Sequence, residues 1–223
     1  FLGRDAAGLP TLVETGHATV GKLEADGRFH YDFRGPQLHG TLPQLEPGEQ
    51  TIEQRIGGTV LEARIRAEGF TSWDDFDAAV ARAVEQALTP PTAAEERAAW
   101  EKAARALAIL REIAGEIGRA MAPLVATYLG APHFFVPERY VLGSAIAERR
   151  GRGPDGQVLS DAQGRDLFIG MVQDGFYREL TTHFGVDHTT ARTITDGIIR
   201  SRLDRRREIM AAAAGLSDLR HQT

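Results

Sequence analysis

The chain contains no cysteine and only two lysines among its 223 residues. The absence of cysteine excludes disulfides, thiolate zinc sites and cysteine nucleophiles together, and it suits the cytoplasm, where we expect the protein to be located. Arginine supplies almost all of the positive charge, and 26 basic residues face 31 acidic ones, so the formal net charge is −5. This balance provides no overall basic surface, so neither nucleic acid nor a membrane is expected as a partner.

Long apolar runs are also missing. The most apolar run, residues 107–129, is interrupted by the charged side chains Arg111, Glu112, Glu116 and Arg119. A membrane-spanning helix needs about 20 predominantly apolar residues, so the sequence predicts no transmembrane segment. The chain begins at Phe1 rather than at methionine, and no signal-peptide pattern follows. We therefore expect a product that is processed or truncated at its N-terminus.

Short alternating runs near the start of the chain predict a β-hairpin. Residues 17–23 and 28–33 alternate in polarity, and Ala-Asp-Gly at 25–27 lies between them. Asp-Gly between two such runs is typical of a tight hairpin turn. Much further along, the apolar residues 133–142 predict a buried strand, which Pro137 interrupts.

Helical periodicity dominates the centre of the chain. Residues 51–70 have a helical pattern, and Ser72 followed by Asp75 predicts the start of another helix. The longest predicted helix ends at Gly130, and we expect Pro123 to kink it or to begin a new segment. Its apolar residues recur at steps of three and four, which indicates one buried face. That face consists of Leu107, Leu110, Ile113, Ile117, Met121, Leu124 and Tyr128.

The order of these elements predicts the fold class. Strands come first, helices follow, and a later strand is flanked by helices, which favours an α/β or α+β fold. The composition, with 42% hydrophobic and 26% charged residues, is that of an ordinary globular protein. We therefore expect residues 1–223 to form a single lobe around one core.

Two short glutamate motifs carry the most specific chemistry. Glu-Thr-Gly-His occupies residues 14–17, and Gly-Gly-Thr-Val-Leu-Glu occupies residues 57–62. A carboxylate accepts hydrogen bonds from two sugar hydroxyls, and a neutral imidazole offers one donor and one acceptor. Glu14 and His17, three residues apart around a glycine, can therefore converge on a polyol.

The order of the motifs resembles the second half of a sugar kinase of the ROK family (repressor, open reading frame, kinase). That family carries Glu-x-Gly-His, then Gly-x-Leu-Glu, then a helical region and a strand that ends in glycines; the later segments match residues 117–125 and 140–147. The resemblance implies an actin-like, ribonuclease H-like lobe with long helices. It also implies that Glu14, His17 and Glu62 contact the sugar.

By the same resemblance, Gly143 and Ser144 border the nucleotide, and the intact enzyme transfers phosphate from ATP with Mg²⁺ to a sugar hydroxyl. The family's zinc-binding cysteines are missing, as in its cysteine-free members, so no protein-bound metal is expected. No residue before Glu14 matches the family's Asp-x-Gly-x-Thr strand or its catalytic aspartate, which leaves the catalytic residues unassigned. The expectation is therefore the sugar-binding lobe of a bacterial, homo-oligomeric hexose kinase, or a non-catalytic sugar-sensing pseudokinase.

Simpler interpretations remain for the same residues. Glu62 lies four residues before Arg66, so the two side chains can form an ordinary ion pair along a helix. The histidines at 17, 30 and 39 lack the spacing typical of metal ligands. Neither pattern by itself requires a binding site.

Residues 177–198 indicate a different class of function. They resemble a helix-turn-helix in which Phe-Gly-Val at 184–186 forms the turn. Thr189, Thr190 and Arg192 would then face the major groove of DNA. The second half of the segment also fits a strand, and the local charge is nearly balanced, so a DNA-binding regulator is the alternative to the sugar-binding lobe.

Overall fold

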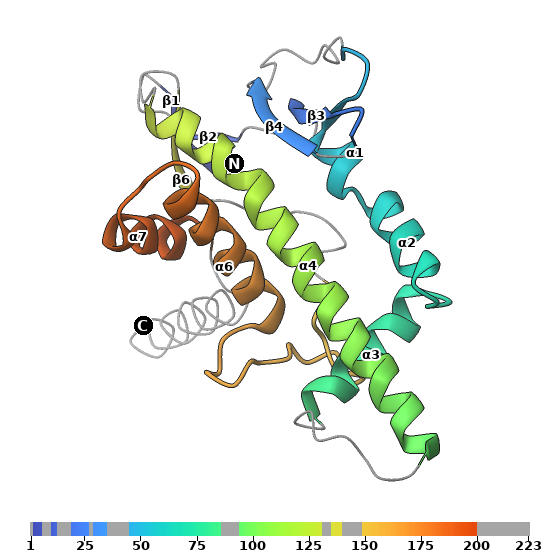
Figure 1. Cartoon of the computed structure of the whole chain (residues 1–223). Helices are drawn as coiled ribbons and strands as arrows, with labels where there is room; N and C mark the ends of the chain where they lie inside the picture. Colours follow the sequence, from blue (N-terminus) through green and yellow to red (C-terminus); the bar gives the residue numbers. More distant parts are fainter. Residues whose placement is uncertain are drawn as a thin grey trace, which may run out of the picture.

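The molecule is organised around one long helix, α4 (Ala94–Gly130), which α3 and α6 pack against (Figure 1). The structure, a computed structural model, describes residues 2–5, 10–12, 19–26, 29–34, 45–85, 94–130, 135–139 and 149–199. Within these ranges the other helices are α1 (Ile52–Ile56), α2 (Gly58–Ala67), α3 (Trp73–Glu85), α6 (Leu167–Thr182) and α7 (His188–Ile198).

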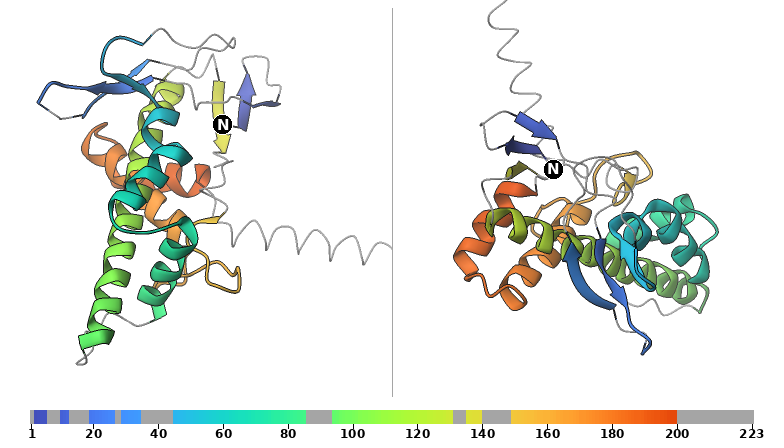
Figure 2. Two further views of the ribbon diagram at one scale, coloured as in Figure 1. Left: turned by 90° about the vertical axis from the view of Figure 1, so that its right-hand side faces the viewer. Right: turned by 90° about the horizontal axis from the view of Figure 1, so that it is seen from above.

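Two small sheets lie toward the C-terminal end of α4, on different sides of it (Figures 1 and 2). One has the strand order β2-β1-β6 and the other β4-β3-β5, and every described pair is antiparallel. The strands are β1 (Leu2–Asp5), β2 (Pro10–Leu12), β3 (Thr19–Leu23), β4 (Phe29–Arg34), β5 (Glu49–Thr51) and β6 (Phe135–Arg139). The described chain is thus a mixture of helices and strands in which helices dominate, which agrees with the generic class that the sequence predicts.

Both predicted strand regions form strands within the described ranges, but Pro137 does not interrupt the later strand, and the burial of that strand stays a prediction. β3 and β4 form the expected hairpin, with Lys22 opposite His30. β6 forms in the segment where a strand was expected, and Pro137 lies within it, opposite Gly3 of β1. The strand therefore tolerates a residue that lacks one backbone donor.

A single cluster of buried hydrophobic side chains connects α3, α4 and α6. Phe76, Phe168 and Phe176 are fully buried in it, and burying such a side chain contributes about 2–3 kcal/mol relative to leaving it exposed. The predicted face of the long helix is confirmed where its side chains are described. Leu110, Ile113, Ile117 and Met121 are buried and Leu107 is half-buried, while positions 124 and 128 lie outside the described side chains.

The expected interruption at Pro123 does not begin a new segment. α4 is one helix from Ala94 to Gly130, with Pro123 inside it. The prediction did not take tertiary packing into account. Ala120, Met121 and Ala122, which directly precede Pro123, are all buried. Contacts on several sides can hold a helix together where proline removes one hydrogen bond.

Helices α4 and α6 approach each other so closely that only glycine fits at their crossing. A Cβ atom at Gly118 would lie 2.2 Å from the carbonyl oxygen of Val172, and one at Gly175 would lie 2.5 Å from that of Gly115. Because side-chain carbons do not reach such distances from backbone oxygens, any larger residue would push the helices apart. These glycines therefore set the distance between the two longest helices of the core.

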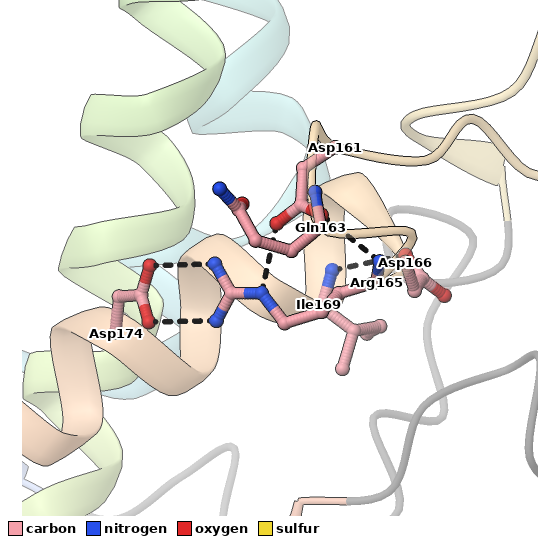
Figure 3. A network of polar contacts seen from close by, with 6 residues as sticks. All are labelled: Asp161, Gln163, Arg165, Asp166, Ile169 and Asp174. Carbon is pink, nitrogen blue, oxygen red and sulfur yellow. Dashed lines mark hydrogen bonds and ion pairs between the residues drawn. The ribbon is translucent and has the colours of Figure 1, made fainter.

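A polar network fixes the chain just before α6 (Figure 3). The Arg165 guanidinium donates to both oxygens of Asp174, at 3.1 and 3.3 Å, and to Asp161 at 2.8 Å. The bonds to Asp174 raise the pKa of Arg165. Burial opposes the ionisation of Asp161, but hydrogen bonds from Arg165 outweigh it and lower the pKa of that carboxyl. Asp166 then caps α6 by accepting a hydrogen bond from the Ile169 amide at 3.1 Å.

Candidate functional site

The residues expected at the sugar and nucleotide sites are only partly covered by the structure. Glu14, His17, Gly143 and Ser144 lie outside the described residues. Glu62 is described, in the second turn of α2. The convergence of the two glutamate motifs therefore stays a prediction, and the geometry around Glu62 is the part of it that can be analysed.

Glu62 lies on the outer side of α2, beside the buried Leu61. Its side chain is 41% exposed and accepts hydrogen bonds from Arg66, at 3.2 Å from Nε and 2.8 Å from Nη2. The simpler interpretation of Glu62, an ion pair with Arg66 along the helix, is therefore confirmed. Both bonds reach Oε1, and no bond from the described part of the chain is recorded at Oε2, so the carboxylate retains acceptor capacity.

The local geometry explains why glycine precedes this helix. α1 begins with a capping box in which the Gln54 amide donates to Thr51 Oγ1 at 3.2 Å and the Thr51 amide donates back to Gln54 at 2.9 Å. Gly57 then separates α1 from α2, and a Cβ there would lie 2.2 Å from the carbonyl oxygen of Glu53. Gly57 therefore permits a close junction between two helices, and α2 starts immediately after it at Gly58.

Ion pairs hold α1 and α2 against α4. Glu116 of α4 lies 2.5 Å from Arg55 of α1 and 3.6 Å from Arg64 of α2, and Arg64 also pairs with the exposed Glu112. The Glu116 side chain is only 12% exposed, so its two arginine partners offset the cost of burying its charge. These contacts fix the orientation of α2 and thereby the position of Glu62.

A pair of buried charges that the sequence did not indicate connects α3 to the segment before α6. Arg150 Nη1 lies 2.7 Å from Asp77 Oδ2, with the two side chains 6% and 18% exposed. The Arg150 guanidinium also lies over the Trp73 ring, 4.1 Å from its centroid. Burial raises the pKa of Asp77 to about 6, against the attraction of Arg150, and burial lowers the pKa of Arg150. No short motif relates residues this far apart in sequence.

Residues 177–198 contain parts of two helices joined by a short turn, as a helix-turn-helix requires, while a role in DNA binding stays a prediction. α6 ends at Thr182, α7 follows from His188 to Ile198, and the possibility that this part forms a strand is wrong. The strand reading failed because Asp187 caps a helix start that alternation alone did not show. Thr189, Thr190 and Arg192 are all exposed, as a surface for a partner requires.

Comparisons with known proteins provide no relative: no family model, no curated protein and no solved structure matches the chain. Within the described ranges, no three side chains of the types that bind metals gather in one place. No helix among the described residues is long and apolar enough to span a bilayer. Function must therefore be inferred from the motifs and their geometry.

Proposed function

We propose that the chain is the carbohydrate-binding lobe of an ATP-dependent hexose kinase of the ROK type, with an actin-like fold. In this proposal Glu14, His17 and Glu62 hold the sugar hydroxyls, while Gly143 and Ser144 border the nucleotide. ATP with Mg²⁺ supplies the phosphoryl group that the complete enzyme transfers, mainly by positioning and charge stabilisation.

One observation supports this proposal above the others. The strand β3, which begins two residues after His17, pairs with β5, and Thr19 lies opposite Thr51. The helix α1 begins directly after Thr51 and leads through α2 to Glu62. The pairing therefore brings the chain that follows the first motif beside the chain that leads to the second, although 45 positions separate His17 from Glu62 in the sequence.

The state of Glu62 fits a ligand that binds from solvent. Its carboxylate is half-exposed, so a sugar can reach it without any opening of the core. Arg66 occupies one oxygen and orients the group. A hydrogen bond from a sugar hydroxyl to such a charged acceptor stabilises a complex by about 1.5–3 kcal/mol, which corresponds to roughly a tenfold change in affinity or more.

Isothermal titration calorimetry with a panel of hexoses tests the proposal. We expect one or a few hexoses to bind, and we expect Glu14→Gln and Glu62→Gln each to weaken that binding about tenfold or more, because each removes a charged acceptor. Glu101→Gln is the matched control, since Glu101 is exposed on α4 and belongs to neither motif.

The possible outcomes separate the alternatives. No heat with any hexose, or an equal loss in Glu101→Gln, would contradict the sugar site. Sugar binding without ATP-dependent release of ADP would favour the non-catalytic sensor over the kinase. Binding accompanied by phosphorylation of the sugar would support the full proposal.

A further inference from the structure

Three side chains of α6 and α7 form a polar contact that the sugar site does not involve. Tyr177 lies on α6, and His188 and Arg192 lie one turn apart on α7, which packs beside α6 (Figure 1). The Tyr177 hydroxyl is 2.7 Å from His188 Nδ1, and the Arg192 guanidinium is 4.4 Å from the centroid of the Tyr177 ring. The phenol is therefore held at its oxygen by an imidazole and on its face by a cation.

The ring of Tyr177 is anchored in the core, while its oxygen lies at a position that solvent reaches. Tyr177 is half-buried and packs against the hydrophobic cluster, whereas His188 is exposed. Asp187 caps α7 by accepting hydrogen bonds from the amides of Thr189 and Thr190, both at 3.0 Å, which fixes the first turn of α7, where His188 lies. A molecule from solvent can thus approach the bond between the phenol and the imidazole without any opening of the core.

A phenol that is hydrogen-bonded to an imidazole has the geometry of a nucleophile with its base. When the imidazole is neutral and carries its hydrogen on Nε2, Nδ1 accepts the hydroxyl proton. His188 can then take this proton while the Tyr177 oxygen attacks an electrophile, so attack does not depend on the small population of free phenolate near neutral pH.

The charged and titratable groups around this pair leave His188 as the proton acceptor. Asp187 and Asp196 lie on the same helix as Arg192 and weaken its field, so Arg192 serves to hold the ring. Within the described part of the chain, the other such groups near the pair on α6 and the turn after it are Asp174, which pairs with Arg165, and Arg178, Glu179 and His183.

We propose that Tyr177 is a covalent modification site, at which the phenol oxygen attacks an activated phosphoryl group and His188 accepts the phenolic proton. In this step an oxygen–phosphorus bond forms, the bond from phosphorus to the leaving group breaks, and the leaving group departs with the bonding electron pair. The proton passes to His188 Nδ1 and from there to solvent. The proposal goes beyond the sugar site and does not depend on it.

Labelling of the full chain with an alkyl fluorophosphonate, whose leaving group is fluoride, tests this proposal when peptide mass spectrometry locates the label. We expect Tyr177 to be labelled in preference to the other tyrosines of the chain. His188→Gln should slow the labelling of Tyr177 about tenfold or more, because glutamine is polar but cannot act as a base. Arg192→Gln should slow it about two- to fivefold, as expected for the loss of one exposed cation–π contact.

The pH dependence of the labelling rate identifies the base. In wild type the rate should change little between about pH 7.5 and 9, because an ordinary imidazole is neutral throughout this range. In His188→Gln the rate should rise about tenfold per pH unit over the same range, as expected when only the free phenolate attacks.

His183→Gln is the matched control, because His183 is also exposed at the end of α6 but contacts the Phe184 ring. If the bond between Tyr177 and His188 only joins the two helices, His188→Gln would free the hydroxyl, and labelling would stay equal or become faster. That result, a lack of preference for Tyr177, or an equal slowing in His183→Gln would each overturn the proposal.

Circular dichroism checks that the variants fold. If His188→Gln does not fold, the wild-type pH profile decides the question. A labelling rate of Tyr177 in wild type that rises about tenfold per pH unit between about pH 7.5 and 9 would show attack by the free phenolate and would also overturn the proposal.

Discussion

Two contacts within the helical core are opposite in character. α4 and α6 meet through Gly115, Gly118 and Gly175, where backbones touch and no charge is involved. α3 meets the segment before α6 through Asp77 and Arg150, a largely buried ion pair. The first contact depends on shape and the second on ionisation, so one methyl group should break the first and a change of pH should alter the second.

The largest expected effect breaks the shape-dependent contact. Gly175→Ala should lower the free energy of unfolding by about 3 kcal/mol, because overpacking a close crossing displaces helices or forces strained backbone. The added Cβ would lie 2.5 Å from the carbonyl oxygen of Gly115. Urea denaturation followed by circular dichroism measures the change.

Gly197→Ala on α7 is the control for this substitution. No atom lies within 4 Å of a Cβ added at Gly197, so the same change should be neutral or stabilise the protein by up to about 1 kcal/mol through helix propensity. Equal stability of the two variants would contradict the close crossing of α4 and α6.

An intermediate effect is expected at the ion-dependent contact as the pH changes. The pKa of Asp77 is raised to about 6 in the folded protein, mainly by burial, from 3.8 in its absence. The folded state therefore binds this proton more tightly than the unfolded state, and the contribution of Asp77 to stability is largest below about pH 4 and is lost as the pH rises through about 6. For one proton, the free energy of unfolding cannot change by more than about 1.4 kcal/mol per pH unit.

The comparison of wild type with Asp77→Asn isolates this group, since other titrations cancel between them. We expect the stability of wild type relative to Asp77→Asn to increase as the pH falls from 7 to about 4. If the free energies of unfolding of wild type and Asp77→Asn differ by the same amount at every pH in this range, the pKa of Asp77 is not raised in the folded protein.

The smallest effect is expected at an exposed ion pair, which sharpens the contrast with both buried contacts. Glu62→Gln removes the charge that pairs with Arg66 on the surface of α2. Exposed pairs of this kind contribute about 0.3–0.5 kcal/mol, so thermal unfolding should hardly change. A loss of several kcal/mol would contradict this view of the pair, whereas an unchanged stability makes the variant suitable for the sugar titration.

The features that were predictable from the sequence depend on neighbours in the chain. The Asp-Gly turn at 26–27 indicated the hairpin of β3 and β4, and Ser72 indicated the start of α3, where its hydroxyl accepts a hydrogen bond from the Asp75 amide. The spacing of Glu62 and Arg66 indicated their ion pair in the same way. Each signal lies within a few residues, which is why it can be read without the fold.

The two candidate sites also differ in how far local sequence signals could predict them. The pattern around Gly185 was recognisable locally, but it left open whether residues 192–199 form a strand or a helix; the structure continues α7 to Ile198 after the Asp187 cap, with Ala191, Thr195 and Ile198 buried. The sugar site requires Glu14 and His17 to meet Glu62, and a meeting of distant motifs cannot be derived from either motif alone.

By itself the sequence determined the turns, the helix caps and the apolar face of α4, because these arise from interactions between residues a few positions apart. Only the tertiary structure decided that Gly118 and Gly175 are contact points between helices and that Asp77 and Arg150 share a buried site. A glycine or an aspartate has the same local preferences in many settings. What it contributes depends on which distant part of the chain folding brings within a few ångströms of it.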